Sequence, residues 1–397
     1  MPTAAADPND LTKNISLPSE TLKREKIQRL PQLDFLRGVA ILLVLLSHQV
    51  YQPPSGAMKQ FAEVLHVFGQ TGVDLFFVLS GFLVGSLLLS EILKTKDLRI
   101  GNFLIRRGMK IWPGYYVFIA VAFVHRLWHH EDTLRSATAR MWPLVFNLQN
   151  YLGPFDVVGH CWSLAVEEHF YLILPLLFAF LCRAKIRRIS FESMPKILIG
   201  IILTCIALRF VVAWNIGQLN PWLKFTTHSR MDALFLGVLV AYFYKMQPNW
   251  FATLKRHNTA IVCVGMLLLS LRIFTPESNA MMWSVNVVAT YLGHALCLVY
   301  LLQVEPGVGL VGNLLRSNLC KLLCFVGLYS YSIYLWHFEF VGPFVMYRLL
   351  QFIPDPFKFF LGMFVYIVGA IIFGVIAAKL IEQPMLRIRE RVFPSTI

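Results

Sequence analysis

Charged residues are scarce in this sequence: aspartate, glutamate, lysine and arginine together make up 15% of its 397 residues. Hydrophobic residues make up 57%, and the mean hydropathy is +0.60. A soluble core of this chain length cannot bury so much apolar surface. The composition therefore predicts a polytopic membrane protein of the all-α class, because a segment surrounded by lipid must satisfy its backbone hydrogen bonds internally.

Acidic residues are scarcer than basic ones, 22 against 36, which gives a formal net charge of +14. Such a charge is typical of nucleic-acid-binding proteins. The sequence lacks a basic stripe with interleaved aromatic residues, however, and its basic residues lie between apolar runs. We therefore predict no nucleic-acid partner and interpret the charge as a determinant of membrane topology.

Cysteine is also sparse, and its seven positions are scattered. Only Cys161 falls in a predicted outer loop, so no external disulfide is expected. Cys320 and Cys324 form a lone CxxxC, which supplies too few ligands for a structural zinc site. We expect no metal. The first thirty residues contain no apolar h-region, so no signal peptide is expected either.

Long apolar runs are what the sequence has in abundance. A membrane-spanning helix needs about 17 to 25 mostly apolar residues, and about ten segments meet this requirement. They are residues 35–51, 72–93, 111–128, 164–182, 197–216, 231–246, 258–274, 284–303, 327–350 and 357–382. This pattern predicts a transmembrane domain over 33–386, preceded by a polar tail over 1–32 and followed by a basic tail over 387–397.

Lysine and arginine are concentrated in alternate connections. The N-terminal tail and the segments 94–110 and 183–196 are rich in them, whereas 52–71 and 275–283 are poor. The positive-inside rule then places both termini in the cytosol, in agreement with an even number of spans. The expected location is the cell (inner) membrane.

Two polar residues interrupt the first predicted span, LDFLRGVAILLVLLSHQV. Arg37 and His48 are eleven residues apart, which at 100° per residue is about 20° from three full turns. A continuous helix would place them on one stripe, separated by roughly 16 Å along the axis. We predict Arg37 at the cytosolic mouth and His48 deep in the membrane.

Other ionisable residues lie in predicted spans or directly at their start, where they are costly and commonly mark a functional site. The predicted topology places them in the middle or outer half of the membrane, which favours a polar chamber that opens outward. They are Asp74, Glu167, Glu168, Arg230, Asp232 and His337.

Purely structural interpretations remain open for several of these residues. Glu167 and Glu168 suit the start of a helix through its dipole, and Arg230 with Asp232 suits a structural ion pair. A histidine on an apolar helix is often a satisfied core residue. Three further basic residues suit a topology determinant or contacts with lipid headgroups: Arg106, Arg107 and Lys110.

The segment DFLRGVAILLVLLSH resembles the opening helix of the acyltransferase-3 family of integral membrane acyltransferases, whose signature is an arginine, ten residues and a histidine. Six further stretches follow in the family's order: GVDLFFVLSGFLVG, FLIRRGMKIWPGYY, HCWSLAVEEHFYLILPLL, SRMDALFLGVLVAY, YSYSIYLWH and IEQPMLRIRER. The resemblance extends from about residue 31 to 391 and implies the stand-alone form, without an SGNH-type domain.

The resemblance implies transfer of an acyl group, usually acetyl from acetyl-CoA, to a hydroxyl of a cell-surface or exported glycan. It makes His48 the catalytic histidine and Arg37 the family's essential arginine, and it makes Glu167 and Glu168 the acids of WSLAVEE. The segment from Arg107 to Lys110 stands where the family has a cytosolic RxxR.

The sequence departs from the family at three positions: Lys110 replaces the usual second arginine, His169 stands where glutamine is commoner, and Glu339 stands where an apolar residue is commoner. The lysine keeps the charge but loses the planar fork that grips phosphate in two bonds.

These residues can be assigned to separate roles in acyl transfer. An imidazole of near-neutral pKa suits deprotonation of a sugar hydroxyl, so His48 is expected to act as general base or as an acyl relay, with Glu167 or Glu168 orienting it or holding the acceptor. The acyl-CoA phosphates are expected at Arg106, Arg107 and Lys110, and the pantetheine near Arg37. The expected acceptor-binding residues are Asp74, Trp162, Arg230, Asp232 and His337.

A transporter or flippase of a lipid-linked sugar is the alternative, with the ionisable residues as a proton or substrate path. The sequence shows no inverted repeat and no paired Gly/Pro-broken helices, which favours the enzyme.

Overall fold

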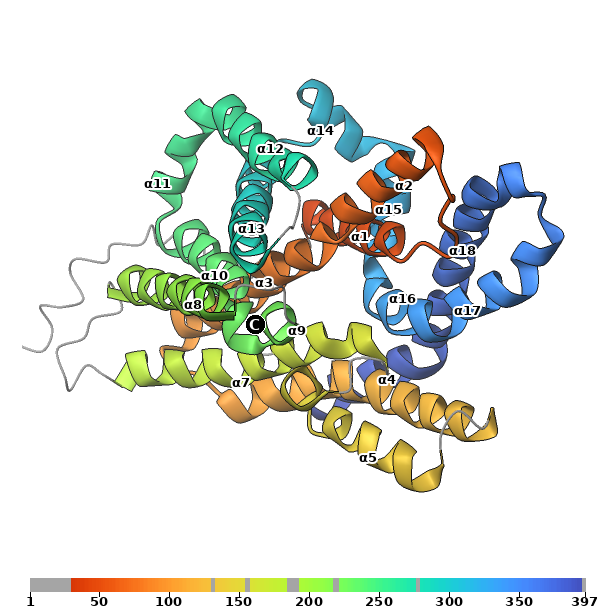
Figure 1. The fold of residues 1–397 in the computed structure, drawn as a ribbon. Helices are drawn as coiled ribbons and strands as arrows, with labels where there is room; N and C mark the ends of the chain where they lie inside the picture. Colours follow the sequence, from red (N-terminus) through yellow and green to blue (C-terminus); the bar gives the residue numbers. More distant parts are fainter. Residues whose placement is uncertain are drawn as a thin grey trace, which may run out of the picture.

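The computed structural model describes residues 30–129, 133–153, 158–183, 193–216, 221–275 and 279–394. All regular structure in these ranges is helical (Figure 1). Residues 1–29 of the predicted N-terminal tail, most of the basic segment 183–196 and the last three residues of the C-terminal tail lie outside the described ranges.

Nine long helices form the body of the part of the chain that the structure describes. They are α1 (Pro31–Ser47), α3 (Thr71–Thr95), α4 (Ile100–Trp128), α7 (Trp162–Arg183), α8 (Met194–Ile216), α10 (Met231–Met246), α12 (Asn258–Phe274), α13 (Ala280–Gln303) and α18 (Asp355–Ala377). Shorter helices connect or extend them, among them α2 (Gly56–Gly69), α5 (Leu134–Val145), α14 (Gly309–Arg316), α15 (Asn318–Leu328), α16 (Ser330–Trp336) and α19 (Gln383–Val392).

Six of the described helices are long and apolar enough to cross a membrane, or seven if the bent pair α14 and α15 counts as one span. The chain is therefore a multi-pass helical membrane protein. The number of ten spans is not confirmed, because some predicted segments are short or broken. Helix α10 has only 16 residues, about 24 Å of helix. The predicted span 327–350 is interrupted after α16 by a π-helical turn over His337–Val341.

Helix α1 begins and ends with clear local signals. Pro31 occupies its first turn, where proline costs no hydrogen bond, and Asp34 lies in the same turn and favours the dipole. The helix ends at Ser47, and His48 has non-helical dihedral angles of φ −101° and ψ 58°. His48 is thus the C-cap residue, one position beyond the helix, and it is not part of the continuous helix on which the prediction of a shared stripe depends.

Two hydrophobic cores lie on either side of α1 and α3. Helices α8, α10 and α13 pack with α3 and α7 around the first core, while α4, α16 and α18 pack with α1 around the second (Figure 1). Val73, Phe76 and Tyr331 contact both cores. The boundary between the cores is where the polar residues described below come together.

Glycines allow two of the helix pairs to pack closely, as is common in membrane proteins. A Cβ atom at Gly81 of α3 would collide with the carbonyl of Leu234 in α10, and one at Gly237 would collide with the carbonyl of Val78. Gly38 and Gly327 bring α1 and α15 together in the same way. These contacts hold α1 and α3 in fixed positions at the centre of the bundle.

Candidate active site

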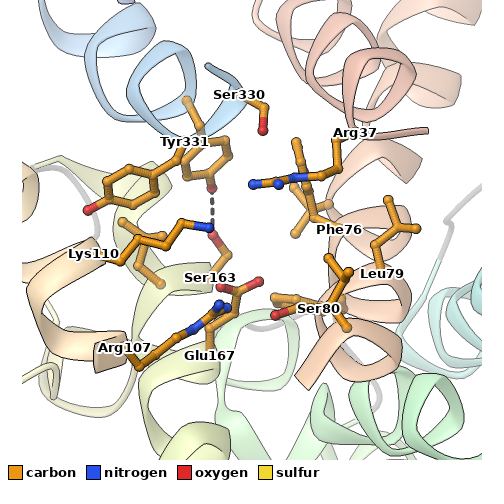
Figure 2. Close-up of a pocket in the computed structure, with 15 residues that line it drawn as sticks. Arg37, Phe76, Leu79, Ser80, Arg107, Lys110, Ser163, Glu167, Ser330 and Tyr331 are labelled. Carbon is orange, nitrogen blue, oxygen red and sulfur yellow. Dashed lines mark hydrogen bonds between the residues drawn. The ribbon is translucent and has the colours of Figure 1, made fainter. Parts of the chain in front are cut away.

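A cavity of about 90 Å³ lies between the two cores, where α1, α3, α4, α7 and α16 meet. Figure 2 shows its walls. Its polar lining consists of Arg37, Ser80, Arg107, Lys110, Ser163, Glu167, Ser330, Tyr331 and Tyr334, and aliphatic and phenylalanine side chains form the rest.

Three cations point into this cavity from two helices. Arg37 comes from α1, and Arg107 and Lys110 come from α4 (Figure 2). Residues three apart on a helix differ by 300°, so Arg107 and Lys110 share one face. Glu167 is the carboxylate that lines the same space. Three positive groups around one carboxylate suit a bound group that is anionic or rich in hydrogen-bond acceptors.

Glu167 and Arg107 are joined through a tyrosine. The hydroxyl of Tyr171 donates to Glu167 Oε2 at 2.6 Å, and the guanidinium of Arg107 donates to the same hydroxyl. Arg107 also lies over the Tyr171 ring, with its Cζ atom 4.1 Å from the centroid. Because Glu167 and Tyr171 are four residues apart on α7, their side chains meet on one face. The arginine is thereby held in one orientation at the cavity wall.

The two acids of the WSLAVEE motif have different surroundings. Glu167 faces the cavity, whereas Glu168 Oε2 accepts a hydrogen bond from Trp112 Nε1 at 3.0 Å. Neighbouring residues on a helix point about 100° apart, which accounts for the difference. Sequence reasoning could not choose between the two acids. The structure places only Glu167 among the residues that line the cavity.

Arg106 also points away from the cavity. Its Nη2 atom lies 3.0 Å from Glu390 Oε1 on α19, and its guanidinium donates to the carbonyl of Phe393. Of the three basic residues predicted to bind the donor phosphates, Arg107 and Lys110 therefore share the cavity with Arg37, and Arg106 lies at the contact between α4 and α19.

Three histidines pack against one another beyond the cavity wall. The rings of His48 and His337 have centroids 5.0 Å apart, and those of His337 and His160 have centroids 5.3 Å apart. His48 and His337 were expected to be functional, but His160 was not singled out. The sequence does contain an indication of His160, because this residue begins the quoted HCWSL stretch.

Each imidazole in this cluster has a nitrogen close to a backbone carbonyl. His48 Nδ1 lies 2.9 Å from Val44 O, His337 Nδ1 lies 2.6 Å from Tyr334 O, and His160 Nε2 lies 3.1 Å from Leu335 O. A carbonyl only accepts, so these nitrogens carry the proton in the neutral rings. The basic nitrogens are consequently Nε2 of His48, Nε2 of His337 and Nδ1 of His160.

His337 and His160 are both buried, and their basic nitrogens have no hydrogen-bond partner among the residues described. A buried acceptor without a donor is costly, and in a native structure such atoms often mark a functional site. His48 is only half-buried. It is therefore the most exposed member of the cluster.

Tyr334 and Ser163 stand between the histidines and the cavity. The Tyr334 hydroxyl donates to the carbonyl of His160 at 2.6 Å and lies 2.6 Å from Ser163 Oγ. Both residues line the cavity, and the ring of Tyr334 also packs against His337, with centroids 5.6 Å apart. One layer of side chains thus separates the cationic cavity from the histidine cluster.

The remaining ionisable residues form buried ion pairs elsewhere in the bundle. Arg230 Nη2 lies 2.6 Å from Asp74 Oδ1, and Arg209 pairs with Asp232. The alternative in which Arg230 pairs with Asp232 is therefore wrong. Neither pair lines the cavity, so the predicted chamber containing all six ionisable residues is not what the structure forms.

Trp162 packs against one of these ion pairs. Its ring lies under the guanidinium of Arg230, whose Cζ atom is 5.3 Å from the ring centroid, and it also contacts Phe225 and Phe77. Trp162 therefore belongs to the Asp74–Arg230 group and does not line the cavity.

Within the described ranges, no three His, Cys, Asp or Glu side chains are grouped so that they could hold a metal ion. The Sγ atoms of Cys320 and Cys324 lie 3.8 Å apart in α15.

A family model described as an acyltransferase domain, that of the acyltransferase-3 family, matches residues 30–379. The chain belongs to the acyltransferase-3 family. The cavity, the histidine cluster and all the helices that form them fall within the matched range.

Relatives from Staphylococcus aureus are similar over most of the chain. O-acetyltransferase OatA of strain NCTC 8325 / PS 47 is 27% identical over 377 residues, which cover 90% of this chain and 57% of that protein. OatA of strain MRSA252 shows the same identity and coverage. The chain thus spans a little over half the length of these curated relatives. No solved structure matches the chain.

Proposed function

We propose that this chain is a membrane O-acetyltransferase that moves an acetyl group from cytosolic acetyl-CoA to a hydroxyl of a cell-surface or exported glycan. The observation that carries the proposal is the position of the cationic cavity directly behind the His48, His160 and His337 cluster. The family and the names of the OatA relatives support the reaction class.

The cavity is assigned to the donor. Arg37, Arg107 and Lys110 offer charge-assisted hydrogen bonds to the phosphates and carbonyl groups of an acyl-CoA arm. Glu167 acts on this side of the site, because it holds Arg107 through Tyr171. It is thus a positioning residue for donor binding, and Glu168 has no role in the reaction.

The half-buried face of the histidine cluster is assigned to the acceptor. The fixed N–H of His48 Nδ1 leaves Nε2 as the base. The acceptor hydroxyl loses its proton to Nε2 while its oxygen bonds to the acetyl carbon. The bond between carbon and sulfur then breaks, and the thiolate of CoA recovers that proton from His48.

An acyl-histidine relay uses the same atom. In that variant Nε2 of His48 bonds to the acetyl carbon, the carbon–sulfur bond breaks and the CoA thiolate leaves. The acceptor oxygen then bonds to the acetyl carbon, the bond to Nε2 breaks, and the proton of the acceptor hydroxyl passes to the thiolate. To distinguish the relay from direct transfer, the purified protein is mixed with radiolabelled acetyl-CoA without acceptor, and the reaction is rapidly quenched. Label on the His48 peptide supports the relay, and its absence from that peptide under single turnover supports direct transfer.

The function is tested in cells and with purified protein. Mass spectrometry of surface glycans from strains with and without the gene should show an acetyl group that depends on the gene. The purified protein should transfer label from acetyl-CoA to those glycans. Unchanged glycans together with transport of a lipid-linked sugar would overturn the proposal and favour the flippase.

A further inference from the structure

Two arginines converge on one carboxylate oxygen at the contact between α4 and α19. Glu390 Oε1 accepts from Arg106 Nη2 at 3.0 Å, from Arg389 Nη2 at 2.6 Å and from Arg389 Nε at 3.1 Å. Three N–H groups on two planar guanidiniums can bind phosphate oxygens in two or more bonds. We call the guanidiniums of Arg106 and Arg389 the arginine fork.

The carboxylate in this fork is more exposed than the arginines. The side chain of Glu390 is 48% exposed, whereas those of Arg106 and Arg389 are 23% and 18% exposed. An ion pair at the surface contributes little to stability, so an incoming anion can replace the glutamate at low cost. A phosphate monoester carries more charge than a carboxylate and three acceptor oxygens.

The fork lies beside the donor cavity. Arg106 directly precedes Arg107, whose side chain lines the cavity, and α19, which carries Arg389, packs against α4, which carries Lys110. A ligand that extends from the cavity toward α19 therefore passes from Arg107 and Lys110 to Arg106 and Arg389.

We propose that Arg106 and Arg389 bind a phosphate monoester in place of Glu390, and that this group is the 3′-phosphate of the CoA donor. The inference rests on the proposed function and extends it to a residue of α19. Glu390 holds the fork when the donor is absent and competes with the phosphate when the donor binds.

The phosphate of an anionic lipid headgroup has the same chemistry, so the experiment separates the two sources. The full-length protein is placed in nanodiscs of phosphatidylcholine, with or without phosphatidylglycerol. Binding of CoA is then compared with binding of dephospho-CoA, which lacks only the 3′-phosphate. The variants are Arg389→Gln and Glu390→Gln, with Arg391→Gln as a control that removes the same charge from the same helix.

We expect CoA to bind the wild type about tenfold more tightly than dephospho-CoA, the size of a good charge-assisted contact. Arg389→Gln should abolish this preference and leave dephospho-CoA unaffected. Glu390→Gln should tighten binding of CoA alone, a gain that misfolding cannot produce. Arg391→Gln should behave as the wild type.

If the wild type binds CoA and dephospho-CoA equally, then Arg106 and Arg389 do not bind the 3′-phosphate, and the proposed function is unaffected. Binding of neither molecule overturns the proposed function itself. If Arg389→Gln reduces only the enrichment of phosphatidylglycerol around the protein, and the preference for CoA persists, then the fork binds a lipid headgroup and the assignment to CoA is wrong.

Discussion

His48 and His337 lie edge to face, with their ring centroids 5.0 Å apart. Both rings direct Nδ1 at a backbone carbonyl, so both keep Nε2 basic. The proposed base therefore has a second basic nitrogen beside it, on a residue that is completely buried. This arrangement depends on the ends of helices, because His48 follows α1 and His337 begins a π-helical turn. Such turns are frequent at functional sites.

Removal of the basic nitrogens of His337 and His160 should reduce turnover while the fold is kept. In His337→Asn the amide can still donate to Tyr334 O, and in His160→Gln the amide can still donate to Leu335 O. We expect acetyl transfer to fall at least about tenfold in each variant, which is less than the roughly 10²- to 10⁴-fold effect of a general base itself. The measurements are transfer kinetics and thermal unfolding in detergent. Full activity in both variants would make these histidines structural.

The two motif acids provide a matched pair of variants. Glu167→Gln weakens the contact with Tyr171 that fixes Arg107, so the KM for acetyl-CoA should rise about tenfold. Glu168→Gln keeps an acceptor oxygen for Trp112 and should stay within about twofold of wild type, since Glu168 lies outside the lining of the cavity. Steady-state kinetics with varied acetyl-CoA measure both. The reverse order of effects would contradict the assignment of Glu167 to the cavity.

Arg107→Lys tests whether the geometry of the guanidinium is needed. A lysine keeps the charge but cannot contact Tyr171 and a phosphate through one planar fork. We predict a KM for acetyl-CoA raised about tenfold and a kcat close to wild type, because the residue acts on donor binding. A fall in kcat at unchanged KM would place Arg107 in the chemical step.

Because α3 packs closely on α10, we predict that one added methyl group at this contact lowers the stability of the protein. Gly81→Ala should lower the unfolding temperature markedly, because the new Cβ meets the backbone carbonyl of Leu234, and backbone cannot yield as a flexible side chain does. A Cβ at Gly200 of α8 meets nothing within 4 Å, so Gly200→Ala should be neutral or stabilise by up to about 1 kcal/mol. Equal unfolding temperatures would contradict this account of the helix contact.

The sequence was sufficient to predict a helical membrane protein, and three of the four cations predicted to bind the donor line the cavity, Arg106 being the exception. Arg107 and Lys110 are placed together by helical spacing alone, and Arg37 by the motif. The pairing of Asp74 with Arg230 and of Asp232 with Arg209 could not be predicted, because these residues are distant in sequence and meet only through the packing of α3, α8 and α10.

Local breaks account for the other differences. No residue pattern predicts that α1 ends at Ser47, which leaves His48 as a C-cap residue with non-helical dihedral angles. The π-helical turn at His337 likewise breaks a segment that reads as one continuous span. The roles of Tyr171 and Tyr334 were missed because a tyrosine in an apolar helix is most often simply part of the core.

The central claim is that Nε2 of His48 is the base or acyl carrier, and His48→Asn tests it most directly. The asparagine amide can still donate to Val44 O, so the variant keeps the local hydrogen bond and loses the basic nitrogen. The purified wild type and variant are given radiolabelled acetyl-CoA and the isolated glycan, and transferred label is counted. We predict loss of transfer with CoA binding retained. Transfer at the wild-type rate by His48→Asn would contradict the mechanism.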